Sequence, residues 1–319
     1  MATAQDGNGQ IYPLAVAVVN SENDDAWSFF FSELRLVVPD HPELYFVSDR
    51  HLSIGKGLRN SYRLAKHGYC IYHIYQNFKR KFGRQDLFGI FKKAAQAYTV
   101  AEFNHQFAQI IAASPKIGQY LKDAGVENWA RAHFHGNRFN IMTSNNAECL
   151  NGLWKTQRQW PILALFDAIV ETISKWFCQR REAASNWDQY LSPSVYTLVE
   201  VNYRRAAKMS VRRLSQFEAE VMVGTCRYSV NLNARTCDCN MFQIDKVPCA
   251  HAIAVASDRG VRLTDLVHPM FKNECVREVY KETVHLVPPT GRWSIPEAVS
   301  SIPCCPPNVQ RHAGRPRIN

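Results

Sequence analysis

Four potential metal ligands in the C-terminal third place the strongest constraint on how this chain can fold. Cys237 and Cys239 are separated by one residue, and Cys249 and His251 repeat that spacing a short distance later. Three thiolates and one imidazole suit Zn²⁺ in tetrahedral geometry, and four protein ligands leave no coordination position open. We therefore predict a closed structural zinc site, whose binding contributes about 10–16 kcal/mol to the folding of a small module.

The other cysteines and the size of the chain favour this interpretation over a disulfide scaffold. The chain has 319 residues and 10 cysteines, and the cysteines outside the cluster are scattered along it. Disulfide scaffolds serve short secreted domains that lack a core, whereas 46% of these residues are hydrophobic. The alternative is a chance grouping of buried, inert thiols.

The charge of the chain narrows the class of its partners. The 38 Lys and Arg residues exceed the 28 Asp and Glu residues, which gives a net charge of +10. Such a surplus favours a polyanionic partner. The longest apolar stretch, residues 12–19, is far shorter than the ~20 residues of a membrane helix, and no signal-peptide pattern opens the sequence. We expect no membrane, no secretion and no small-molecule substrate.

Hydrophobic periodicity predicts which segments in the first part of the chain form strands and which form helices. Residues 12–19 and 44–47 read as strands, and each is followed by residues with helical spacing. The stretch 78–142 is basic at its start and then amphipathic, which predicts a helical insertion. Asn145 and Glu148 have the spacing of a capping box at the start of another helix.

The C-terminal part has a different organisation. A helical linker is predicted over residues 186–215, followed by an alternating hairpin around Gly224 and a short helix at 250–256. With the metal cluster between them, these elements predict a small ββα zinc-finger module over residues 216–268. Periodicity is then lost, and proline and glycine are frequent, so residues 269–319 are predicted to be a mostly disordered tail.

Five ordered motifs carry a resemblance to a known family. They read DGNGQIYPLAVAVVNSENDDAWSFF, VSDRH, CIYHIYQN, MTSNNAECLNGLWK and the C-D-C…P-C-A-H of the metal cluster. In this order, over roughly residues 6–268, they resemble plant Mutator-like (MULE) transposases with a SWIM-type zinc finger. The resemblance implies a mixed fold, α+β or α/β, with a ribonuclease-H-like transposase core over residues 1–185 ahead of the linker and the finger.

The resemblance also implies carboxylates for metal-dependent DNA chemistry. Ribonuclease-H-like transposases hold two Mg²⁺ or Mn²⁺ ions with three carboxylates during DNA strand cleavage and transfer. Asp49 matches the second carboxylate and Glu148 the third, and helix capping is the alternative for each. The family's first aspartate lies on a strand upstream of Met1, and Asp6, in a polar turn, is not assigned to its place. We expect an N-terminally truncated core without full transposase activity.

Further residues are candidates for DNA contact. Cys70 and His73 match a Cys-x-x-His pair of the family, with a structural or a DNA-facing role; the alternative is a core thiol and a surface histidine. Clustered basic side chains give salt-dependent affinity for phosphates, although a solvated helix face is the alternative for each cluster. In the tail, Gly-Arg-Pro resembles the core of an AT-hook, which reads a narrow A·T minor groove. The basic candidates are Lys79, Arg80, Lys81, Arg84, Arg180, Arg181, Arg204, Arg205, Lys208, Arg212 and Arg213, with Arg315 and Arg317 in the tail.

Three hypotheses for function follow from these observations. The first is a transposase-derived protein of the nucleus that binds zinc and DNA but lacks full transposase activity. The second is a transcriptional regulator domesticated from such a transposase. The third is a fragment of an active transposase, which would need Mg²⁺ or Mn²⁺. In each case the expected partners are DNA and either a second copy of the chain or another transposase chain.

Overall fold

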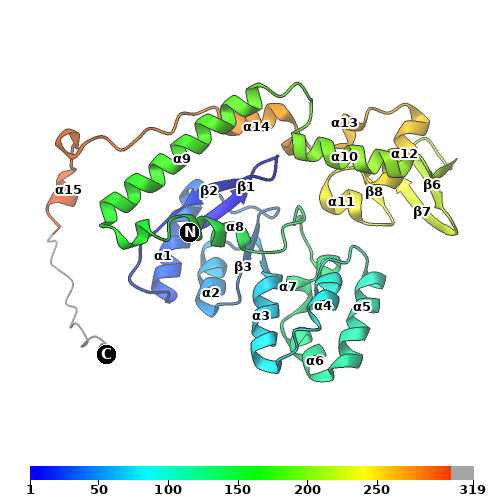
Figure 1. Cartoon of the computed structure of the whole chain (residues 1–319), viewed down its shortest axis with the longest axis horizontal. Coiled ribbons are helices and arrows are strands. Elements are labelled where there is room, and N and C mark those ends of the chain that lie inside the picture. Colours follow the sequence, from blue (N-terminus) through cyan, green and yellow to red (C-terminus); the bar gives the residue numbers. More distant parts are fainter. Residues whose placement is uncertain (303–319) are drawn as a thin grey trace, which may run out of the picture.

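The computed structural model describes residues 1–302 (Figure 1). Its N-terminal unit contains two pairs of strands. The first pair is an antiparallel hairpin, and the second pair is parallel, with a helix as its crossover. In chain order the elements are β1 (Ala2–Gln5), β2 (Ile11–Ala15), α1 (Asp24–Val37), β3 (Tyr45–Ser48), α2 (Leu52–Ser61) and β4 (Lys66–Tyr69).

The two helices of this unit pack closely against each other. Asn23 caps α1 by accepting a hydrogen bond from the Ala26 N–H, which satisfies one of the free amides of the first turn. From α1, Leu34 points into a small apolar core and is only 1% exposed. On α2, Gly57 is required by the close approach, because a Cβ there would lie 2.9 Å from the Phe31 ring.

The strands of the N-terminal unit do not join into one sheet. Within residues 1–302, β1 pairs only with β2 and β3 only with β4. A cavity of about 1060 Å³ is lined by residues of β1, β3 and the start of α8 (Asn145–Leu153). The mixed α+β class is confirmed, whereas the expected ribonuclease-H-like core is not, because among residues 1–302 these four strands form two separate pairs.

A block of short helices follows. Its core is built from aromatic and aliphatic side chains around Trp129, which is fully buried and donates its indole N–H to the Leu121 carbonyl. The block was expected to begin at residue 78. It begins at residue 71, because Ile71 and Ile74 already belong to its core. Its helices are α3 (Ile71–Phe82), α4 (Phe88–Ala95), α5 (Val100–Ala113), α6 (Pro115–Asp123) and α7 (Val126–Trp129).

Two long helices connect this part to the C-terminal module. They are α9 (Ile162–Ser185) and α10 (Pro193–Ala206), and Figure 1 shows both along one side of the molecule. Among the described residues, no helix has the length and apolar character needed to cross a bilayer.

The structure differs from the expected disordered tail between residues 269 and 280. Here α14 (Asn273–Val279) packs against α9, and Tyr280 is fully buried. The Tyr280 hydroxyl donates to the Asp6 carboxylate at 2.7 Å, and Arg180 donates to the same hydroxyl at 3.0 Å. Buried contacts with distant residues therefore order a segment that has no periodicity of its own. Short helical turns follow, η4 (Thr290–Arg292) and α15 (Glu297–Ser300).

The C-terminal module contains a four-stranded antiparallel sheet in the order β5-β6-β7-β8. The expected hairpin is present as β6 and β7, and its turn uses Gly224 with a φ of 59°. The module is larger than a ββα unit, because β5 comes from the expected linker and β8 carries a cysteine of the metal cluster. Its elements are β5 (Ser210–Arg213), β6 (Glu218–Val223), β7 (Cys226–Asn231), β8 (Thr236–Cys237), α11 (Met241–Asp245), α12 (Ala250–Arg259) and α13 (Leu263–Leu266).

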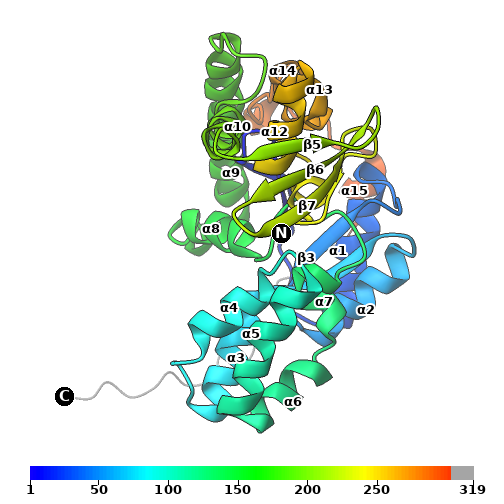
Figure 2. The ribbon, with the colours of Figure 1, turned by 90° about the vertical axis from the view of Figure 1, so that its right-hand side faces the viewer.

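Figures 1 and 2 both place this module next to the helical block. The Tyr98 hydroxyl donates to the Asp245 carboxylate at 2.8 Å, and the Asn240 side chain donates to the Tyr98 carbonyl at 3.1 Å. The guanidinium of Arg131 lies over the Tyr98 ring, 3.5 Å from its centroid. Because α11 follows directly on the cysteine pair, the metal cluster and this interface share one short segment.

Candidate metal centre

The turn after β8 positions the first cysteine pair. Asn240 adopts a left-handed conformation with a φ of 59°, and its N–H donates to the Cys237 carbonyl at 2.8 Å. The side chain of Gln243 makes two hydrogen bonds to the same turn: it accepts from the Cys237 N–H and donates to the Cys237 carbonyl. These bonds turn the Cys-x-Cys segment back toward α12.

The start of α12 positions the second pair. Cys249 is the N-cap residue, and its sulfur accepts a hydrogen bond from the Ala252 N–H at 3.5 Å. His251 lies in the first turn and stacks on the ring of Tyr228 from β7, with the ring centroids 3.9 Å apart. The stacking fixes the imidazole so that its Nδ1 faces the cysteines.

The four donor atoms converge. The sulfur atoms of Cys237, Cys239 and Cys249 and a ring nitrogen of His251 all lie within 4.8 Å of one another. His251 Nδ1 is 3.5 Å from the Cys237 sulfur and 4.0 Å from the Cys249 sulfur. Zn–S bonds of about 2.3 Å and Zn–N bonds of about 2.0 Å place sulfur and nitrogen about 3.5 Å apart in a tetrahedron. The donor set and its spacing fit zinc.

The electrostatics of the cluster favour a thiolate before any metal binds. Hydrogen bonds from the thiols of Cys237 and Cys249 lower the pKa of the Cys239 thiol, while the bond to Cys239 raises the pKa of the Cys237 thiol. A thiolate is the form that ligates metal. The spacing of the ligands predicted this cluster, whereas Gln243 and Tyr228, which orient it, were missed; alternation along β7 was the available signal for Tyr228.

The two expected catalytic carboxylates both line the cavity. Asp49 follows β3, and its carboxylate accepts from the His51 N–H at 2.8 Å, just ahead of α2. Glu148 lies in the first turn of α8. Within the described residues, however, Asp49 joins no group of three or more potential metal ligands. Asp6 is buried, and its carboxylate accepts from the N–H groups of Asn8 and Gln10.

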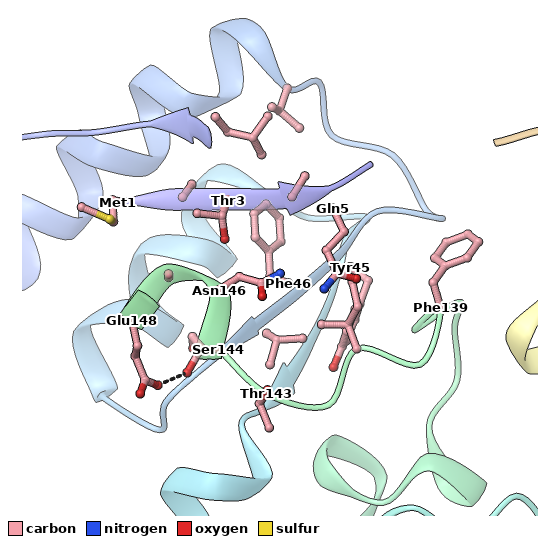
Figure 3. A pocket seen from close by; sticks show the side chains of 18 of the residues that line it. Met1, Thr3, Gln5, Tyr45, Phe46, Phe139, Thr143, Ser144, Asn146 and Glu148 are labelled. Carbon is pink, nitrogen blue, oxygen red and sulfur yellow. Dashed lines mark hydrogen bonds between the residues drawn. The ribbon is translucent and has the colours of Figure 1, made fainter. Parts of the chain in front are cut away.

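Glu148 instead lies next to the Cys-x-x-His pair. The donor atoms of Cys70, His73 and Glu148 are within 4.8 Å of one another. The expected capping box is not formed: the N-cap residue is Ser144 rather than Asn145, and its side chain makes no capping bond. The Ser144 hydroxyl donates to the Glu148 carboxylate at 2.9 Å, at the end of the cavity shown in Figure 3.

Two groups of the basic candidates lie on described surfaces, whereas Arg180 and Arg181 donate hydrogen bonds to backbone carbonyls. Lys79, Arg80 and Lys81 form the last turn of α3, where positive charge also stabilises the helix end. Arg80 donates to the Asn77 side chain, and the Lys81 ammonium lies 5.4 Å from the centroid of the Tyr120 ring. The second surface contains Arg204, Arg205 and Lys208, which gather around a depression beside Val223 of β6. Arg315 and Arg317 lie outside the described residues.

Two protein-family models match separate parts of the chain. Residues 1–77 match the MULE transposase domain, and residues 228–260 match the SWIM zinc finger. The chain is therefore similar to a transposase domain over its first 77 residues and to a zinc-finger module in its C-terminal part. The two matches support a Mutator-like transposase with a SWIM zinc finger. Comparisons with curated proteins and with solved structures gave no match.

Proposed function

We propose that this chain is a transposase-derived DNA-binding protein whose finger, residues 210–260, is held together by one structural zinc ion. The observation that carries the proposal is the convergence of four soft ligands within 4.8 Å. Such a site has no open position, so zinc supplies stability rather than chemistry. Cys237, Cys239, Cys249 and His251 would hold the ion.

The basic surface beside the finger supports DNA as the partner. Arg205 and Lys208 are exposed near the end of α10, next to the exposed end of β6. Arg204 joins them and pairs with Glu200 at 2.6 Å. Positive side chains that face solvent bind phosphates with little sequence preference. A chromosomal DNA partner makes the nucleus the proposed compartment.

The test is binding of the full chain to a labelled duplex, followed by fluorescence anisotropy at several salt concentrations. We expect affinity to fall steeply with salt. The double variant Arg205→Gln/Lys208→Gln should reduce the slope of log K against log salt by roughly 2. The matched control is Lys92→Gln/Lys93→Gln, which removes two exposed charges from α4. Absence of binding at low salt, or an equal effect of both double variants, would contradict the proposal.

A second candidate function is metal-dependent cleavage of DNA. It is favoured by the position of Asp49 and Glu148 on the wall of one cavity, since carboxylate oxygens are the ligands that Mg²⁺ and Mn²⁺ prefer. Nicking of a duplex by the wild-type chain with Mn²⁺, lost in Asp49→Asn, would establish this activity. The DNA-binding role proposed above predicts no such nicking, because Asp49 joins no group of three or more potential metal ligands among residues 1–302.

A further inference from the structure

Outside the finger, one more group of side chains has the composition of a metal site. Cys70 is the N-cap residue of α3 and His73 lies in the first turn of that helix, while Glu148 lies in the first turn of α8. Their donor atoms lie within 4.8 Å of one another. The Cys70 side chain is fully buried, whereas the side chains of His73 and Glu148 are 33% and 44% exposed.

Backbone hydrogen bonds connect the start of α3 to β3 and to the segment that leads into α8. The Cys70 N–H donates to the Ser48 carbonyl at 2.7 Å, which continues the β3–β4 pairing up to the start of α3. The next N–H, of Ile71, donates to the Met142 carbonyl at 3.1 Å and so ties α3 to the segment that leads into α8. Cys70 and His73 are three residues apart at the beginning of a helix, so both side chains face the same side.

Ser144 orients two of the three donors. Its hydroxyl lies 3.4 Å from Nδ1 of His73 and donates to Glu148 at 2.9 Å. If the hydroxyl donates to the carboxylate, it accepts from His73 Nδ1–H, which leaves the lone pair on Nε2. That nitrogen lies 3.6 Å from the Glu148 carboxylate, close to the separation of about 3.3 Å between nitrogen and oxygen ligands of a tetrahedral zinc ion. Metal-ligating histidines commonly have their second nitrogen fixed in this way.

We propose that Cys70, His73 and Glu148 form a second transition-metal site, selective for Zn²⁺ over Mg²⁺. A thiolate and an imidazole are poor ligands for Mg²⁺ but good ligands for zinc. Three protein ligands leave one position open. His73 and Glu148 line the cavity, so this position faces the cavity and takes a water molecule.

The proposal reassigns Glu148 and does not depend on DNA binding. The resemblance implies that Glu148 shares magnesium with Asp49, whereas in the structure its carboxylate lies within 4.8 Å of a thiol and an imidazole. An ion at this site occupies the carboxylate of Glu148 and removes it from use by Mg²⁺.

The test is metal titration of the purified full chain. Inductively coupled plasma mass spectrometry after zinc loading should give two zinc ions per chain, and one in His73→Gln and in Glu148→Gln. Both residues are partly exposed, so these variants are expected to fold, and circular dichroism checks that they do. The matched control is Cys149→Ser, which replaces an exposed thiol on α8 next to Glu148 and should keep two.

Cobalt and a positioning variant sharpen the test. With Co²⁺, the second site should add one thiolate-to-cobalt charge-transfer contribution that disappears in Cys70→Ser. Ser144→Ala should keep the stoichiometry but weaken zinc binding at the second site about 10- to 100-fold, because it frees the imidazole and the carboxylate. One ion per wild-type chain at saturation, or two ions in folded His73→Gln, would overturn the proposal.

Discussion

The finger and the N-terminal unit each contain four strands, but they arrange them differently. In the finger the strands form one antiparallel sheet, with a cluster of four metal ligands at its edge. In the N-terminal unit they form two separate pairs beside a cavity of about 1060 Å³. Each strand of the finger pairs with its neighbour in sequence through a short turn, whereas β3 and β4 pair in parallel and need the α2 crossover between them.

This comparison predicts that the two regions lose stability in different ways. The finger should depend mainly on its ion, because the ligands connect β8 to α12. The N-terminal unit should depend on the packing of α1 against α2, whose core contains Leu34 and Leu58. The following changes separate these two sources of stability, in order of decreasing effect.

Removal of zinc should have the largest effect. A chelator, or Cys249→Ser, removes a binding free energy of about 10–16 kcal/mol from the finger, and hydrogen exchange should show loss of protection across residues 210–260. Amides of α1 and α2 should stay protected. The control is Cys226→Ser, an exposed cysteine of β7 outside the cluster. Unchanged protection of the finger after complete zinc removal would break the comparison.

Leu34→Ala should affect the other region. Leu34 is 1% exposed, and truncating a buried leucine costs about 2–5 kcal/mol. Hydrogen exchange should speed up in α1 and α2, while the zinc content of the finger stays constant. The exposed neighbour Leu36, changed to Ala, serves as the control. An equal effect of both variants would show that α1–α2 packing does not support the unit.

Acid should weaken the N-terminal unit through His67. Burial lowers the pKa of this histidine from 6.5 to about 4, and the ring bonds to the Ser48 hydroxyl at 2.8 Å. Between pH 6.5 and about pH 4, His67 therefore binds a proton in the unfolded chain but not in the folded chain. Stability is therefore full above pH 6.5 and falls by about 3 kcal/mol as the pH drops toward 4.

The readout for this prediction is hydrogen exchange of β3 and β4 in the zinc-loaded chain at a series of pH values. His67→Gln should reduce the pH dependence of these amides. The same pH dependence in wild type and variant would assign the acid sensitivity to other groups.

The smallest effect is expected where the finger meets the helical block. Burial raises the pKa of the Asp245 carboxyl, and the Tyr98 hydroxyl is one of the groups that compensate by donating to it. Tyr98→Phe should destabilise the contact by about 1 kcal/mol, seen as faster exchange in α11. Tyr72→Phe, at an exposed tyrosine, is the control and should leave α11 unchanged.

The sequence was most informative where the determinants are local. The spacing of Cys237, Cys239, Cys249 and His251 predicts their convergence, and alternation on both sides of Gly224 predicts the hairpin. The order of Tyr280 was not predictable in this way, because its partner Asp6 is 274 residues away. The thiol of Cys70, the imidazole of His73 and the carboxylate of Glu148 give no periodic signal that joins them. Their proximity follows from the path of the chain between α3 and α8.

X-ray absorption at the zinc edge of the His73→Gln chain tests the central claim most directly, because only the finger should then hold zinc. The account predicts one ion with three sulfur ligands at about 2.3 Å and one nitrogen ligand at about 2.0 Å, and no water. A coordination shell with fewer than three sulfur atoms, or with a bound water, would contradict a closed structural site at Cys237, Cys239, Cys249 and His251.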